Sequence, residues 1–94
     1  MKIIGLSRLS IYTAAHADCR SWITNWICDI RASSWTNTHD IRAKYPTASF
    51  LGANVVIFNV RGNNYRLVTR IAFNTGILSV IWIGNHAEYT QRYS

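Results

Sequence analysis

The sequence predicts one α+β domain spanning residues 1–94, in which N-terminal helices pack on an antiparallel β-sheet followed by a short C-terminal helical turn. Three observations point to this fold. Residues 19–30 place apolar side chains at helical spacing, and residues 55–83 contain three apolar runs typical of strands. Turns rich in Gly and Asn separate those runs, so we expect neighbouring strands of one meander. A chain of this length suits a single domain with a thin core.

The start of the chain is predicted to form a short strand, "MKIIG", followed by a helix. Ser7 is a residue type that caps helices, so we expect this helix to begin there and to end near His16. Ile11, Tyr12 and Ala15 would then share one face, which gives the helix an apolar side.

A second helix is predicted from a cap at Asp18 to about Ala32. Its apolar stripe consists of Cys19, Trp22, Ile23, Trp26, Ile27 and Ile30. Because this stripe keeps the helical period, its tryptophans are expected in the core. A short third helix, "HDIRAKY", ends before Pro46, because proline disfavours helical angles in the residue before it.

The second half of the chain is predicted to be mostly strand. The expected strands are Val55–Val60, Tyr65–Phe73 and Ile77–Ile83. The turns between them are Gly62-Asn63-Asn64 and Asn74-Thr75-Gly76. Gly84 should end the last strand, and a helical turn should begin after Asn85 with Glu88 as its capping-box partner. Trp82, near the end of this strand, is expected to be a core or half-buried residue.

The charge of the chain indicates a polyanionic partner. Lys and Arg number 10 against 4 Asp and Glu, which gives a net charge of +6 and a pI near 9.9. Only Lys2 and Lys44 are lysines, so the positive charge is mainly arginine. Arginine binds phosphate with a planar fork and stacks on bases, which favours RNA, although a basic surface without a partner has the same composition.

Cys19 and Cys28 are the two cysteines, and their spacing matches neither a zinc motif nor a disulfide framework. We expect both to be reduced and the protein to be cytoplasmic. The chain has no apolar run long enough for a transmembrane helix, so no membrane association is expected. The residue patterns indicate no metal or other cofactor.

Three arginines lie in the stretch "RGNNYRLVTR", between apolar strands. Strand alternation places Arg66 and Arg70 on the face opposite Leu67, Thr69, Ile71 and Phe73. Arg61 precedes the turn and is expected beside them. The prediction is therefore a basic surface of Arg61, Arg66 and Arg70 on the face of the sheet that the helices leave open, where it can hold several phosphates. The alternative is an exposed face with no ligand, but four acids are too few to pair with all the arginines.

His86 and Tyr89 follow the last strand and are three residues apart, so they share a face of one helical turn. With Arg66 they are the groups needed to cut RNA without a metal. One group must exchange protons with the 2′-hydroxyl and the leaving 5′-oxygen, and others must stabilise the charge on the phosphorane. Histidine is suited to the first task, arginine to the second, and tyrosine can orient the substrate. Such a pair can equally be structural.

Two segments resemble a known family. "VIFNVRGNNYRL" and, near the C-terminus, "HAEY" together closely resemble the HigB family of bacterial type II toxins, which are small mRNA interferases of the RelE-like fold. The resemblance is strongest over Ile41 to Tyr89. Asn85 and Thr90 depart from the residues most common in the family.

The resemblance implies a RelE-like fold, cleavage of mRNA on the translating ribosome through the 2′-hydroxyl, no metal, and inhibition of translation. It also implies a cognate helix-turn-helix antitoxin that forms a hetero-oligomer with the toxin. The catalytic residues it implies are Arg66, His86 and Tyr89. The residues it implies for substrate binding are Arg61, Asn63, Tyr65 and Arg70, and Asn64 of the same turn is predicted to join them.

Two other functions remain compatible with the sequence. One is a non-catalytic RNA- or ribosome-binding module that uses the arginines but not His86. The other is an interaction protein whose basic face docks an acidic antitoxin. Cleavage of mRNA is the observation that separates the leading hypothesis from both.

Overall fold

The computed structural model describes residues 1–93, with side chains as far as Arg92. Within this range the sheet has five strands in the order β1-β5-β4-β3-β2. The predicted antiparallel meander is formed by β3 (Val55–Val60), β4 (Tyr65–Ala72) and β5 (Ile77–Asn85). The parallel strand β1 (Lys2–Ile4) pairs with the start of β5, and β2 (Ser49–Leu51) pairs antiparallel with β3 at the other edge. The predicted α+β class is confirmed.

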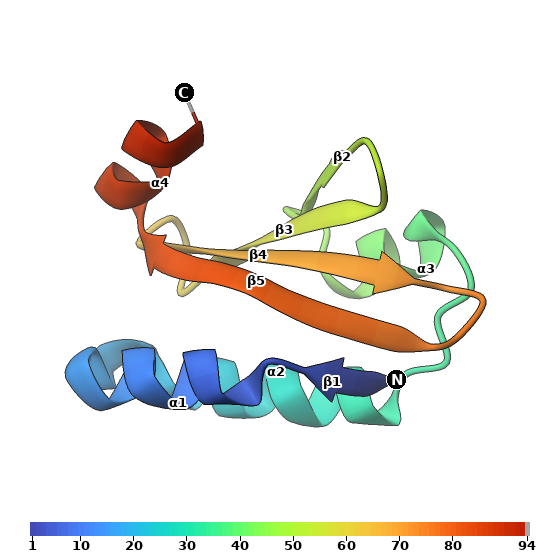
Figure 1. The fold of residues 1–94 in the computed structure, drawn as a ribbon, viewed down its shortest axis with the longest axis horizontal. Helices are drawn as coiled ribbons and strands as arrows, with labels where there is room; N and C mark the ends of the chain where they lie inside the picture. Colours follow the sequence, from blue (N-terminus) through green and yellow to red (C-terminus); the bar gives the residue numbers. More distant parts are fainter. Residues whose placement is uncertain (94) are drawn as a thin grey trace.

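The helices occupy both sides of the sheet. Helices α1 (Leu6–Ala15) and α2 (Arg20–Ala32), joined by a 3-10 turn at Ala17–Cys19, run along one face (Figure 1). Helix α3 (Thr38–Lys44) leads into β2, and α4 (His86–Tyr93) leaves the end of β5 on the side opposite α1 and α2 (Figure 1). Most of one face is therefore left without a covering helix, and α4 stands at one end of it.

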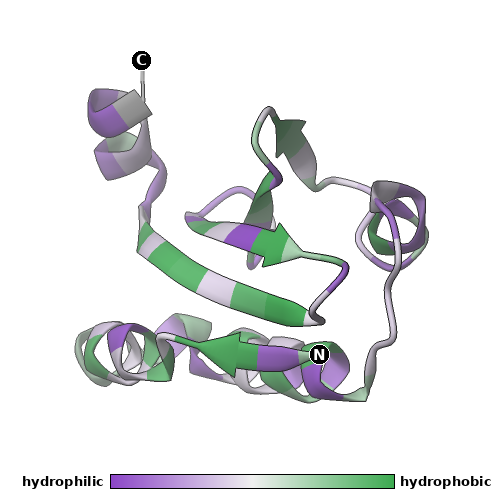
Figure 2. Cartoon of the chain, turned by 45° about the vertical axis from the view of Figure 1, so that its right-hand side comes forward, coloured by the Kyte–Doolittle hydropathy of each residue, from purple (hydrophilic) through white to green (hydrophobic). Residues whose placement is uncertain are grey.

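The core lies between the sheet and the α1–α2 layer. Leu67 and Ile71 of β4 are fully buried in it, as the predicted alternation requires. Trp26 of α2 is 1% exposed and packs edge-to-face on Phe58, with ring centroids 5.5 Å apart. Figure 2 shows β5, a long strand that packs against α1, as mostly hydrophobic.

The start of α1 differs from the prediction. Gly5, not Ser7, is the N-cap residue, and its φ of 95° lies in the left-handed region that glycine adopts readily. A Cβ at Gly5 would lie 3.0 Å from the carbonyl oxygen of Val80, so only glycine lets the chain pass this close to β5. The helix therefore begins directly after a glycine that packs closely against β5.

The packing face of α1 is also different. Leu9 and Thr13 point into the protein, whereas Ile11, predicted on the apolar face, is 74% exposed. The Thr13 hydroxyl donates to the Leu9 carbonyl oxygen at 2.9 Å, which satisfies it within the helix. The face of α1 that packs against the protein includes a threonine, so a search for apolar residues alone selects the wrong face.

The start of α4 matches the predicted capping box. The Glu88 amide donates to Asn85 Oδ1 at 2.8 Å, and the Asn85 amide donates to Glu88 Oε1 at 2.9 Å. Strand β5 continues through Gly84 to Asn85, two residues past the predicted last residue Ile83. Among residues 1–93, no helix has the length and apolarity needed to cross a membrane.

Candidate functional site

Arg66 lies on the open face of the sheet, close to α4. Its guanidinium carbon is 5.8 Å from the centre of the Tyr89 ring. Its Nη1 donates to the carbonyl oxygens of Asn63 and Tyr65, both at 3.2 Å. The side chain is half-buried and held by its own turn, so its remaining N–H groups are oriented before any ligand binds.

His86 is the first residue of α4 and is exposed. Its backbone amide donates to the carbonyl oxygen of Asn64 at 3.0 Å, which joins α4 to the β3–β4 turn. Tyr89 follows one turn later on the same helix, where it meets Arg66. The structure thus brings the three predicted catalytic residues to the same end of β4 and β5.

Two further residues complete this region, and the sequence did not single them out. The Arg92 guanidinium carbon lies 5.7 Å from the centre of the Trp82 ring, and the Trp82 and Tyr89 ring centroids are 6.3 Å apart. Arg66, Tyr89, Trp82 and Arg92 are named here the basic-aromatic cluster. The indole of Trp82 lies so close to Gly84 that a Cβ at that position would overlap it.

A β-bulge explains why Trp82 lies on the open face. The pairing of β4 with β5 shifts between Val68 and Thr69, whose partners are Trp82 and Val80. Ile81 is the extra residue on β5, so Trp82 and Val80 face opposite sides of the sheet. Strict alternation would put both in the core.

Arg70 lies on the same face as Arg66 and is exposed, as predicted. The two are four residues apart on β4, which is about 13 Å at the usual strand rise. This is a spacing of Cα atoms, and the Arg66 guanidinium is held at the turn end of β4 by Asn63, Tyr65 and Tyr89, so the two arginines extend the basic surface along the strand.

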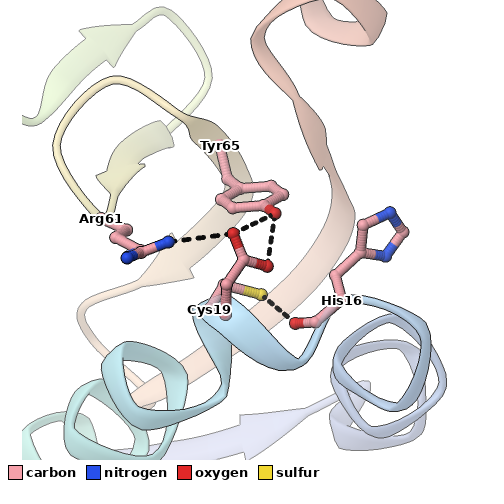
Figure 3. Close-up of polar contacts among 5 residues, drawn as sticks. His16, Cys19, Arg61 and Tyr65 are labelled. Atoms are coloured by element: carbon pink, nitrogen blue, oxygen red, sulfur yellow. Dashed lines mark hydrogen bonds and ion pairs between the residues drawn. The ribbon is translucent and has the colours of Figure 1, made fainter.

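The predicted position of Arg61 is wrong. Arg61 follows the end of β3 with a φ of 51°, and its guanidinium turns toward the helices, where Nη1 lies 3.0 Å from Asp18 Oδ2 (Figure 3). Tyr65 also faces the helices, and its hydroxyl donates to the Asp18 carboxylate at 2.7 and 2.8 Å (Figure 3). Neither side chain therefore joins Arg66 and Arg70 on the open face.

The Asp18–Arg61–Tyr65 contact also corrects the predicted helix cap. Asp18 lies in the 3-10 turn, and α2 begins only at Arg20. Its carboxylate binds the β3–β4 turn across 43 and 47 residues of sequence rather than a helix N-terminus. Asp18 is thus a residue that fixes the turn carrying Asn63 and Asn64.

Residues 19–92 match the model of the HigB toxin family, described as the RelE-like toxic component of a toxin-antitoxin system. The chain belongs to this family. The matched residues include α2, the strands β2 to β5 and the whole basic-aromatic cluster. As a toxic component of such a system, the toxin has an antitoxin as its partner. A search of curated proteins finds no match.

Hydrogen bonding within the Asp18–Arg61–Tyr65 contact changes the pKa of two groups in this toxin, the Asp18 carboxyl and the Tyr65 hydroxyl. The Tyr65 hydroxyl and then the Arg61 guanidinium hold the pKa of Asp18 below its usual value. The same carboxylate raises the pKa of Tyr65 to about 12. Tyr65 therefore stays protonated at neutral pH and donates its hydroxyl hydrogen to Asp18.

We expect Asp18→Asn to lower the melting temperature of the toxin more at pH 7 than at pH 3. A carboxylate whose folded pKa is lowered stabilises the fold fully above its unfolded pKa of about 3.9, and this stabilisation is lost as the pH falls through the folded pKa. Thermal melts of both proteins from pH 3 to pH 7 check this. A difference in melting temperature that stayed constant over this range would contradict it.

Tyr12 of α1 connects this region with α4. Its ring stacks on His16, with centroids 3.9 Å apart, and its hydroxyl lies 3.5 Å from Glu88 Oε1. Burial, followed by the nearby Glu88 carboxylate, raises the pKa of Tyr12. Glu88 therefore both caps α4 and contacts α1.

Across residues 1–93, no three His, Cys, Asp or Glu side chains lie close enough together to hold a metal ion.

Proposed function

We propose that this toxin is an endoribonuclease that cuts mRNA on translating ribosomes in the cytoplasm, through attack of the 2′-hydroxyl and without a metal. Membership of the HigB family, a family of RelE-like toxins, supports inhibition of translation as its role. The observation that carries the proposal is the pairing of Arg66 with Tyr89, with His86 one turn away on the same helix. This is a cation, a proton-exchanging group and an aromatic side chain at one exposed end of the sheet.

Each residue has a defined task in the proposed reaction. Arg66 donates to the phosphorane oxygens, where negative charge develops. His86 exchanges a proton with the attacking 2′-hydroxyl or with the leaving 5′-oxygen. Tyr89 stacks on a base or donates to a phosphate and so orients the substrate.

Other predicted residues fit substrate binding. Asn63 and Asn64 are exposed in the turn whose carbonyl groups accept from Arg66 and from the His86 amide. Arg70 extends the basic surface along β4 toward the next nucleotides. We propose that the antitoxin is a helix-turn-helix protein and that it forms a hetero-oligomer with the toxin.

The test is cleavage of a defined mRNA on programmed ribosomes, followed by analysis of the new RNA ends. Attack by the 2′-hydroxyl breaks the bond to the 5′-oxygen and leaves a 2′,3′-cyclic phosphate and a 5′-hydroxyl. His86→Ala is expected to lower the cleavage rate by about 100-fold or more, because one proton transfer loses its catalyst. His39→Ala, which changes an exposed histidine on α3, is the matched control and should cleave normally.

Three results would contradict the proposal. Ends carrying a 3′-hydroxyl and a 5′-phosphate would exclude attack by the 2′-hydroxyl. Full activity of His86→Ala would exclude His86 from the reaction. Ribosome binding without cleavage by the unmodified toxin would favour a non-catalytic binding module.

A further inference from the structure

Asn59 of β3 lies directly opposite Arg66 of β4 in the sheet. Residues paired in this way point their side chains to the same face, with Cβ atoms about 4.5–5.5 Å apart. Asn59 therefore stands beside the arginine that is proposed to hold the phosphate, although the sequence did not single it out. Its side chain is partly exposed, so a bound RNA can reach it.

One hydrogen bond fixes the direction of the Asn59 amide. Its Nδ2 donates to the carbonyl oxygen of Thr47 at 3.2 Å. A carbonyl oxygen can only accept, so the amide nitrogen must lie on that side and Oδ1 must point away from it. Within the part of the chain that the structure describes, no group donates to this Oδ1. Asn59 therefore offers an oriented hydrogen-bond acceptor next to Arg66.

Asn59 also lines a pocket with a volume of about 340 Å³ beside β3, beyond the three residues that pair with β2. Two partly exposed aromatic rings, one lysine and two asparagines contribute to its wall: Trp22, Tyr45, Lys44, Asn59 and Asn63. The Tyr45 hydroxyl donates to Asp29 Oδ2 at 2.6 Å, and the Trp22 and Tyr45 ring centroids are 6.0 Å apart. Both rings are therefore held in place before a ligand binds.

Three features of this pocket select a nucleotide rather than a peptide. It adjoins the candidate active site, because Asn63 lines the pocket and its carbonyl oxygen accepts from Arg66. Among the described residues, no Val, Leu, Ile or Met lines it, so it lacks the aliphatic contacts that anchor a strand or an amphipathic helix. Aromatic rings for stacking, amides for base edges and a lysine for phosphate are the groups that bind single-stranded RNA.

We propose that this pocket, named here the base pocket, holds the base of the nucleotide next to the phosphate on Arg66, and that Asn59 Oδ1 accepts from an amino group of that base. Adenine and cytosine carry an amino group where guanine and uracil carry a keto oxygen. An oriented acceptor binds the amino group and repels the keto oxygen, so the preferred base is adenine or cytosine. This inference rests on the proposed function, because it names a substrate contact of the same site.

The test crosses one base change with one residue change on programmed ribosomes. Adenosine is replaced by inosine on each side of the cut in turn, which exchanges the amino group for a keto oxygen on the same ring system. The residue change is Asn59→Leu, which keeps a similar size without the acceptor. The matched control is Asn74→Leu, at an exposed asparagine in the β4–β5 turn. Because every toxin meets the same ribosome complexes, the ratio of the two discriminations isolates the Asn59 contact.

We expect the unmodified toxin and Asn74→Leu to cut the adenosine substrate about threefold to tenfold faster than the inosine substrate at one of the two positions, the effect of one oriented hydrogen bond. In Asn59→Leu the two rates should agree within about twofold, through slower cleavage of the adenosine substrate. Its melting temperature should match that of Asn74→Leu, because the lost hydrogen bond lies at the surface.

Full discrimination by Asn59→Leu would overturn the inference. Equal slowing of both substrates would also overturn it, because Asn59 would then have a structural role only. Weaker binding of the purified antitoxin by Asn59→Leu, with unchanged discrimination, would overturn it and assign the pocket to a protein.

A second measurement separates the base pocket from the nuclease activity. Ribosomes are programmed with a 2′-deoxy codon of either deoxyadenosine or deoxyinosine, which lacks the attacking hydroxyl and is not cut, and the affinity of the toxin for each is measured. Tighter binding to the deoxyadenosine codon, lost in Asn59→Leu, would support the base pocket even where the toxin cuts no mRNA. Equal binding of both codons by the unmodified toxin would overturn the base pocket and leave the proposed reaction standing.

Discussion

Arg66→Ala is expected to lower the rate of mRNA cleavage by about 10²–10³-fold, the usual cost of removing a donor that stabilises transition-state charge. The guanidinium is already oriented by the carbonyl groups of Asn63 and Tyr65 and by the ring of Tyr89. Alanine removes the charge together with this preorganised geometry. Single-turnover cleavage on programmed ribosomes gives the rate, and growth after induction gives an independent readout.

The matched control for this experiment is Arg70→Ala. Arg70 is on the same strand and face, is exposed, and lies about 13 Å from Arg66. We expect it to weaken RNA binding less than tenfold, mostly at low salt, because it contacts a phosphate away from the reaction. Arg66→Lys should be intermediate, since lysine keeps the charge but lacks the planar fork. Equal losses from Arg66→Ala and Arg70→Ala would show that Arg66 acts only through general charge.

Trp26→Ala is expected to lower the free energy of unfolding by about 3–5 kcal/mol, because it leaves a large cavity under the sheet. Trp26 is 1% exposed and packs on Phe58. A domain of this size has a total stability of about 5–15 kcal/mol, so this loss is a large fraction of the total and should lower the urea midpoint strongly. Urea denaturation followed by circular dichroism measures the change.

Trp26→Phe separates the two contributions of the indole. Its Nε1 is buried without a hydrogen-bond partner in the part of the chain that the structure describes, so phenylalanine removes an unsatisfied polar group while keeping most of the ring. We expect a clearly smaller loss than for alanine. Ile11→Ala, on an exposed side chain of α1, should change stability by less than about 0.5 kcal/mol. Equal losses from the two Trp26 variants would contradict this view of the indole.

The sequence predicted the helices and the meander because their apolar residues repeat with a clear period. The same reasoning placed Leu67, Ile71 and Arg66 on the correct faces of β4, where no residue interrupts the alternation. Strands β1 and β2 contain three residues each, which is too short to show a period. The parallel pairing of β1 with β5 joins residues distant in sequence, whereas β2 pairs with β3 across a short turn at residues 52–54.

The errors near the candidate site have local physical causes. Alternation could not be extended to Arg61, because it lies in a turn with a positive φ and no longer follows the strand. Trp82 was missed because a bulge shifts the faces of β5, and bulges leave no clear mark in a single sequence. Asp18 is a residue type that often caps helices, but its carboxylate accepts from the hydroxyl of Tyr65 and the guanidinium of Arg61 instead. His86 and Tyr89 were singled out by their spacing and chemistry, and the family resemblance supports the same two residues.

Trp82 packs on Gly84 and contacts both Tyr89 and Arg92 of the basic-aromatic cluster. A Cβ at position 84 would overlap the indole, so any other residue there must displace Trp82 and disturb these contacts. Gly84 therefore constrains how the toxin can evolve, although it carries no functional group. Random mutagenesis should recover few toxic variants at position 84, whereas an exposed position such as Leu51 on β2 should tolerate many substitutions. Drift among related toxins would then spare this glycine together with the indole that covers it.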